Sequence, residues 1–359
     1  MTNRLLPAGM ALLLCGALAP PAAARELWVS EDHERAVELD LALRSTLLGT
    51  RFPDIPSIFP DRHAAASLWR ARPALRARGA AWIAAEVAHD LSATIDHKGE
   101  HDEQHRLDRA LVILTLHPVE VTVGRQAVGW GRAVLFTAVD PFNPFDPLEV
   151  DKEWRRGFDA VRAEVTFSDV LAADALLIKD AAFGRVRGYV GDIDAELMAG
   201  RQEGAAYAGL SASSRLGESE VHGELGAYDL TAVDPIPKST LGASHRFDLG
   251  RGLQVVAEHH YAHLAAPNRQ IAGKHGIGLL TAYDLADLWL GSMAVIVSAQ
   301  DGSGIAAPTL TWLAGELVTV VGALYIPWGA GPEGPWGLKP GSDYGATPWV
   351  ALLQARLYL

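Results

Sequence analysis

The chain has 359 residues, 35 of them glycine, and a net charge of −12 from 31 Lys and Arg against 43 Asp and Glu. This acidic balance argues against a nucleic-acid partner, which needs a basic surface. The single cysteine, Cys15, falls in the first 24 residues, so the rest of the chain can form no disulfide and depends on pairing and packing of its elements.

Residues 1–24 have the organisation of a secretory signal peptide. One charge, Arg4, precedes an apolar run from Ala8 to Ala19 and a small-residue stretch that ends at Ala24. The run is too short to span a bilayer. We therefore expect residues 1–24 to be cleaved. Residues 25–359 show no internal repeat and no linker, so they are predicted to form one domain.

Stretches with a period of two residues fill the next part of the chain. One face of each stretch is apolar and the other is charged, which is typical of half-buried β-strands. These stretches are Val37–Arg44, Leu75–Val87, Val119–Val123, Val161–Phe167 and Arg185–Val190. Arg62–Arg72 is rich in alanine and is predicted to be either a short helix capped by Asp61 or a loop.

From residue 204 onward the apolar and polar stretches follow one another in the rhythm of hairpins. Strands are expected at about 204–214, 218–229, 238–248, 252–263, 272–284, 287–299, 303–314, 316–327 and 345–358. Thr309–Trp328 is the most apolar stretch. Gly315, Glu316 and Pro327 favour a hairpin that turns near Gly315 over a transmembrane helix.

The last residues, Trp349–Leu359, form a strand pattern that runs to the end of the chain. Trp349, Leu353 and Leu357 lie on one face, and polar residues lie on most of the other. The pattern resembles the C-terminal signature of outer-membrane β-barrels, with Leu359 where Phe is commoner. The alternative is the edge strand of a soluble β-sandwich. A barrel strand here would close against the first strand, contact outer-membrane lipid and engage the barrel-assembly machinery.

These patterns predict an all-β fold, an antiparallel up-and-down β-barrel that crosses the bacterial outer membrane. A bacterial barrel has an even number of strands, and we expect about sixteen, with fourteen and eighteen as neighbours. In a barrel the apolar face of each strand meets lipid and the charged face lines the lumen. Charged residues on these faces either line an open passage or pair with one another and plug the lumen.

A motif in the first half of the chain carries a family resemblance. It reads Gly124-Arg125-Gln126 and Trp130-Gly131, then Asp140-Pro141-Phe142-Asn143-Pro144, then Arg156-Gly157-x-Asp159-Ala160. The motif resembles that of bacterial outer-membrane porin-like proteins of poorly assigned function, including alginate-export-like barrels. The similarity covers residues 105–168. It implies a barrel and supplies no catalytic residue and no cofactor.

Residues 130–155 are predicted to be a long, ordered loop, because they contain several prolines and aromatic residues. The loop is acidic. Folded against a basic wall, it would form a constriction with a transverse field, as in general porins; an external lid or rim brace is the alternative. The candidate pore-lining or constriction residues are Arg76, Arg78, Glu120, Gln126, Asp140, Asp146, Arg162, Glu164, Arg185 and Arg187.

Enzyme and metal chemistry find little support in the sequence. His97, His101 and His105 would share a face of a helix and could bind a metal, but their polar surroundings favour a solvated loop. The chain has no Gly-x-Ser-x-Gly elbow. We therefore expect no cofactor and no metal, and a passive channel for polar solutes or polymers. The alternatives are a structural or surface-interaction barrel with a plugged lumen, and an outer-membrane lipid-modifying enzyme.

Overall fold

The computed structural model describes residues 25–32, 34–55, 59–229, 234–333 and 341–359, so the predicted signal peptide lies outside the described residues. Nineteen β-strands account for its regular structure, and none of the described segments is a helix long and apolar enough to cross a membrane. The strands are β1 (Arg25–Val29), β2 (Ala36–Arg51), β3 (His63–Ala80), β4 (Ile83–Asp96), β5 (His101–Leu116), β6 (Val119–Gln126), β7 (Phe158–Ser168), β8 (Leu171–Ile178), β9 (Ala181–Val190), β10 (Ile193–Gln202), β11 (Ala205–Leu216), β12 (Ser219–Tyr228), β13 (Ile236–Phe247), β14 (Leu253–Ala262), β15 (His275–Ala286), β16 (Trp289–Ser298), β17 (Gly304–Leu313), β18 (Val318–Trp328) and β19 (Trp349–Tyr358).

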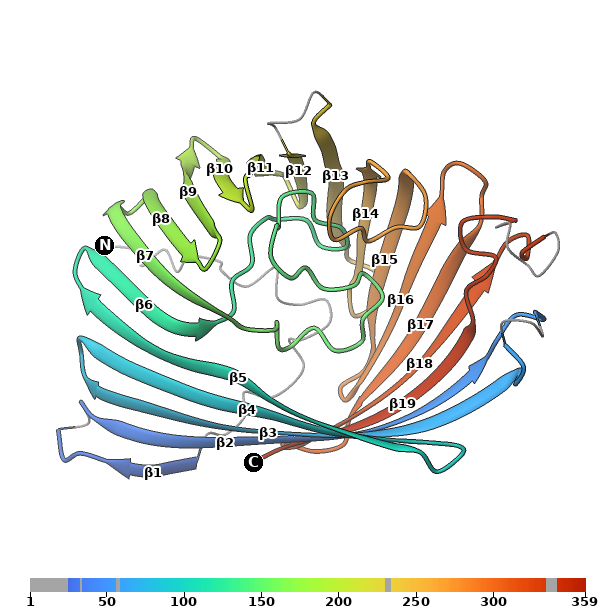
Figure 1. Cartoon of the computed structure of the whole chain (residues 1–359), viewed down its shortest axis with the longest axis horizontal. Helices are drawn as coiled ribbons and strands as arrows, with labels where there is room; N and C mark the ends of the chain where they lie inside the picture. Colours follow the sequence, from blue (N-terminus) through green and yellow to red (C-terminus); the bar gives the residue numbers. More distant parts are fainter. Residues whose placement is uncertain (1–24, 33, 56–58, 230–233, 334–340) are drawn as a thin grey trace.

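Strands β2 to β19 form a closed antiparallel barrel (Figure 1). Each strand pairs with the next along the chain, and β19 pairs with β2. At the seam, the amides of Leu41 and Leu359 each donate to the other's carbonyl at 2.9 Å. The prediction that the C-terminal strand closes against the first barrel strand is confirmed, and the eighteen strands fall within the predicted range.

Strand β1 lies outside this ring. It pairs with residues 36–39 of β2, whereas β19 pairs with residues 42–51 of the same strand. The two strands therefore share one edge of β2. Beyond the end of the C-terminal strand, β1 takes up backbone groups of β2 that would otherwise be unpaired.

The prediction of a helix or loop at Arg62–Arg72 is wrong, because these residues belong to β3. Arg70 and Arg72 point into the barrel and Trp69 points outward, so the alternation is present, but the alanines between these residues obscure it in the sequence.

A second prediction that is wrong is the single strand Leu75–Val87, which the structure divides at Ala81-Trp82 into β3 and β4. The hairpin in Thr309–Trp328 is confirmed, with β17 and β18 on either side of Gly315.

The two ends of the barrel differ. One end has short turns, at residues 81–82, 117–118, 169–170, 191–192, 217–218, 248–252, 287–288 and 314–317. The other carries the long connections, at 52–62, 127–157, 263–274 and 329–348. We call them the turn end and the loop end. In outer-membrane barrels, short turns face the periplasm and long loops face the exterior. The longest strands are β2, β3, β4 and β5, which make the tallest part of the wall.

Candidate functional site: a loop folded across the barrel lumen

Residues 127–157, the connection between β6 and β7, turn inward and occupy the middle of the barrel (Figure 1). We call them the lumen loop. They include the whole of the predicted 130–155 loop. Contacts from opposite sides of the wall hold this segment in place, and the sequence motif supplies many of the residues involved.

The Gly124-Arg125-Gln126 part of the motif shapes the point where the loop leaves the wall. Gly124 has a φ of +119°, and a Cβ there would collide with the Ala110 carbonyl oxygen. Gln126 is buried, and its Nε2 donates to the carbonyls of Thr122 at 3.2 Å and Ala160 at 3.1 Å. The prediction that Gln126 lines the pore is therefore wrong, because its amide anchors the loop and faces no open space.

The return point of the loop is fixed by the last part of the motif. Arg125 forms a bidentate ion pair with Asp159, with N–O distances of 2.8 and 2.7 Å. The Gly157 amide donates to Asp108 Oδ1 at 3.4 Å, and a Cβ on Gly157 would collide with the Asp108 backbone. The two ends of the lumen loop are thus tied together and to β5, which explains why these residues occur as a set.

Two buried glutamates of the wall hold the first half of the loop. Glu224 on β12 accepts the amides of Arg132 at 2.5 Å, Ala133 at 2.8 Å and Ala138 at 2.7 Å. Glu258 on β14 accepts three more amides, from Val134, Leu135 and Phe136, at 2.6 to 3.1 Å. Hydrogen bonds from backbone amides to a carboxylate are charge-assisted and stronger than neutral ones.

The carbonyls of the same half are held by hydroxyl groups of neighbouring strands. Tyr228 donates to the Ala138 carbonyl at 3.0 Å, Thr240 donates to the Phe136 carbonyl at 3.1 Å, and Tyr207 donates to the Val139 carbonyl. The wall thus satisfies both the amides and the carbonyls of this buried stretch. An irregular backbone away from water requires such partners.

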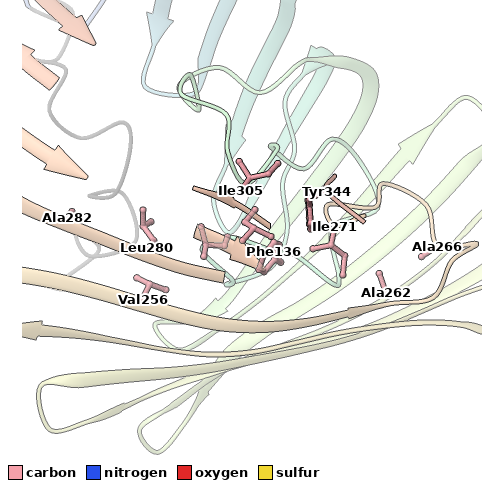
Figure 2. Close-up of a cluster of buried hydrophobic side chains, with 11 residues drawn as sticks. Phe136, Val256, Ala262, Ala266, Ile271, Leu280, Ala282, Ile305 and Tyr344 are labelled. Carbon is pink, nitrogen blue, oxygen red and sulfur yellow. The ribbon is translucent and has the colours of Figure 1, made fainter. Parts of the chain in front are cut away.

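Apolar packing fills the lumen beside β14 to β18. Phe136 from the lumen loop packs with Ile305 on β17 and with Ile271 and Tyr344 from two other loops (Figure 2). Trp130 belongs to a second cluster, with Phe183 of β9 and Tyr207 of β11. The first cluster packs against β14 to β17 and the second against β7 to β12, so apolar side chains of the lumen loop contact a large part of the wall.

The second half of the loop reaches a charged part of the wall. Asp151 and Glu153 form ion pairs with Arg44 of β2, and Tyr358 of β19 donates to Glu153 at 2.7 Å. The Trp154 ring lies under Arg44, with the guanidinium carbon 3.8 Å from the ring centre. The loop therefore crosses the lumen from β12 and β14 to the seam between β2 and β19.

Asp140 was expected at the surface of the constriction, and the structure places it elsewhere. Its side chain is fully buried and pairs with Arg155 of the same loop. Burial raises the pKa of the Asp140 carboxyl, and the nearby Arg155 opposes that shift. Asp140 therefore stabilises the fold of the loop. Asp146 is exposed and caps the following turn, where its Oδ1 accepts the Leu148 amide at 2.9 Å.

The predicted wall arginines all lie on the inward face, and those of β7 and β9 pair with wall carboxylates. Arg162 pairs with Glu164 at 2.6 Å and approaches Asp174 at 3.6 Å. Arg185 pairs with Asp174 at 2.8 Å, and Arg187 pairs with Glu164. The expected pairing of these arginines with acids of the loop is wrong, because Asp151 and Glu153 are bound to Arg44 and Asp140 to Arg155.

In some of the wall pairs the arginine is more exposed than its carboxylate partner, whereas Arg72 is less exposed than Glu86. Arg76 is 48% exposed and lies 2.6 Å from Asp40, which is 11% exposed. Arg106 is 35% exposed and lies 2.5 Å from Asp90, which is 6% exposed. At Arg76 and Arg106 the guanidinium group therefore stands closer to the lumen than its carboxylate partner.

Arg78 and Glu120 lie near the turn end of the barrel. The alternation in β3 places Arg78 on the inward face, opposite Ala36, and it makes no ion pair with any described residue. Glu120 accepts a hydrogen bond from Thr115 at 3.3 Å and is paired across the strands with Glu164. These two residues therefore line the lumen away from the level of the loop.

The sequence did not single out the residues that hold the loop most firmly, which are Arg44, Glu224 and Glu258. Each occupies an inward position of a strand that was predicted. A charged residue in the middle of an alternating strand was the only available signal, and many other positions share it. The partners are loop amides far away in sequence, and no local pattern reports them.

The predicted solvated loop around His97, His101 and His105 is also wrong in part. His97 lies in a turn, but His101 and His105 lie on β5, two pleats apart and outside any helix. Within the described part of the chain, no group of three or more His, Cys, Asp or Glu residues could hold a metal ion.

Comparison with solved structures places the chain among porin-like barrels. OccAB4 of Acinetobacter baumannii has a TM-score of 0.58 at 9% identity, over 92% of this chain and 100% of that one. OccK5 (OpdH) of Pseudomonas aeruginosa has 0.57 at 11%, over 90% and 97%. A triple-mutant porin of Rhodopseudomonas blastica has 0.50 at 12%, over 90% and 100%. At these identities the likeness shows the fold. No protein-family model matches the chain, and no curated protein matches its sequence.

Proposed function

We propose that this protein is a bacterial outer-membrane channel that lets polar solutes pass passively through the lumen, past the lumen loop and the charged side chains of the wall. The observation that carries the proposal is a set of three inward arginines, Arg76, Arg106 and Arg187, which are 48%, 35% and 38% exposed and more exposed than their carboxylate partners. A barrel that served only as a membrane scaffold would have no need to present charge in the lumen.

The exposed inward arginines suggest a preference for anionic solutes. A guanidinium group that faces a narrow, water-filled passage attracts anions, and the carboxylate behind it keeps the wall electrically balanced and folded. Of the five acids of the loop, Asp140, Asp151 and Glu153 are paired with arginines, whereas Asp146 and Glu149 are exposed. The three paired acids therefore contribute little negative potential to the passage.

A plugged structural barrel is the second candidate, and the apolar packing of the lumen loop favours it. Phe136 and Trp130 each pack in an apolar cluster within the lumen. The backbone amides of Leu135 and Ala138, on either side of Phe136, donate hydrogen bonds to the wall glutamates Glu258 and Glu224. Planar-bilayer recording of the purified protein separates the two candidates. The channel proposal expects stepwise ionic conductance, and a silent, correctly folded barrel would support the plugged form.

A further inference from the structure

Three neighbouring strands end at the loop end with side chains that point away from the lumen. Alternation from the inward residues Arg44 and Arg356 places Arg51 of β2 and Trp349 of β19 on the outer face. These two residues are direct cross-strand partners. Trp328 ends the adjacent strand β18. The outer rim of the barrel seam therefore carries two indole rings and a guanidinium group.

A cleft of about 360 Å³ lies at this rim. It is lined by Arg51, Trp328 and Trp349 together with residues of the 52–62 and 329–348 connections, among them Phe52, Arg62 and Thr347. Its walls are held in place. The Phe52 amide donates to the Arg62 carbonyl at 2.9 Å, and the Trp328 indole donates to the Gly302 carbonyl at 2.8 Å.

The cleft has more positive than negative charge in a protein that is acidic overall. Arg51 is exposed and forms no ion pair with any described residue. Arg62 is 45% exposed and lies 3.2 Å from Asp54, the only carboxylate among the described residues that line the cleft. One guanidinium group is thus free and a second is only partly neutralised, next to indole rings that are 39% (Trp328) and 48% (Trp349) exposed.

We propose that this cleft binds the phosphorylated sugar headgroup of a membrane glycolipid. Arginine matches a phosphate with two parallel hydrogen bonds. Tryptophan is enriched where a membrane protein meets the headgroup layer, and its flat ring packs against the apolar side of a sugar and the start of an acyl chain. The acyl chains would continue over outward residues below the cleft, such as Leu47 and Leu353, which are exposed.

This inference rests on the proposed membrane location, since only there does the outer rim meet headgroups. It is independent of conductance, because Arg51 and Trp349 lie on the outer face of the barrel. The channel can therefore fail as a proposal while the lipid site stands, and the reverse is also true.

The test measures binding of lipid A, a bisphosphorylated diglucosamine lipid, to the full-length protein in detergent by native mass spectrometry and by titration. We compare wild type with Arg51→Gln/Arg62→Gln. Arg201→Gln is the matched control, because Arg201 also ends a strand at the loop end on the outer face, in β10. Glucosamine 1-phosphate and dephosphorylated lipid A complete the set of probes. Heat-modifiability on gels shows that each variant is folded.

The expected result is a loss of at least about tenfold in lipid A affinity for the double variant, which corresponds to about 1.4 kcal/mol, and none for Arg201→Gln. Dephosphorylated lipid and the soluble sugar phosphate should both bind more weakly than lipid A to wild type. Equal binding by the double variant, or equal loss in the control, overturns the site. Equal binding of the soluble sugar phosphate overturns its assignment to a lipid.

Discussion

Gly131 lies directly against the carboxylate of Glu224, where a Cβ on the glycine would stand 2.6 Å from Oε1. Gly131 also has a φ of +100°, a conformation that L side chains rarely adopt. Both features bring the amides of Arg132 and Ala133 within hydrogen-bonding distance of the same oxygen. A glycine of the sequence motif thus permits the contact that fixes the lumen loop to the wall.

Replacing Gly131 with alanine should loosen this contact. The new methyl group and the strained φ, which costs on the order of 1–3 kcal/mol, push the loop away from Glu224. We expect a folded barrel whose single-channel current is noisier or larger than that of wild type. Gly191→Ala is the control, since Gly191 also has a positive φ but has open space at its Cβ position. Equal current noise in the two variants would show that the Gly131 contact does not hold the loop.

Removing residues 132–153 should widen the passage. The segment crosses the lumen and is bound at both sides, so its loss leaves a barrel with an open centre. We expect single-channel conductance to rise severalfold while the barrel remains heat-modifiable. An unchanged conductance in a folded deletion variant would mean that the passage does not run past the loop.

The C-terminal strand should be required for assembly. Leu357 pairs with Leu43, and Leu359 bonds to Leu41 at the seam. Replacing Leu357 and Leu359 with Asp places charges on the lipid face of the closing strand, at a cost of up to a few kcal/mol per site that depends on depth. We expect the assembled, heat-modifiable form to disappear. Ala314→Asp, in a short turn, should assemble normally, and normal assembly of the double variant would contradict a membrane strand.

The protein should fractionate with outer membranes. The barrel presents a continuous outward face of apolar residues, including Leu197, Leu225 and Leu241, all more than half exposed. In water such a surface would aggregate. Immunoblots of separated outer-membrane, inner-membrane and periplasmic fractions test this expectation. Recovery of the folded protein in the periplasmic fraction would refute the membrane location.

The sequence allowed the fold to be predicted because many of the barrel strands carry their own period-two pattern. Trp349–Leu359 even indicated how the barrel closes. The first half of β3 was not predicted as a strand, because alanines fill many of its positions and reduce the contrast between the two faces. Strand β1 pairs along only part of one edge of β2, and no alternation marks it.

The site was predicted less well, for a different physical reason. Alternation reports which face of the wall a residue occupies, so Arg162, Arg185 and Arg187 could be placed on the inward face. It does not report a partner. Each of these arginines has a wall carboxylate on its own strand or within two strands, and these outcompete the more distant acids of the loop. Asp140 and Gln126 are buried by tertiary packing that no local pattern reveals.

The most direct test of the central claim is the reversal potential of the channel in a planar bilayer under a gradient of potassium chloride. Because guanidinium groups face the lumen, we expect the reversal potential to have the sign of an anion-selective channel. Arg187→Glu should move it toward cation preference, whereas Arg201→Glu on the outer face should leave it unchanged. A cation-selective wild type, or an Arg187→Glu potential equal to that of wild type, would contradict an arginine-lined passage.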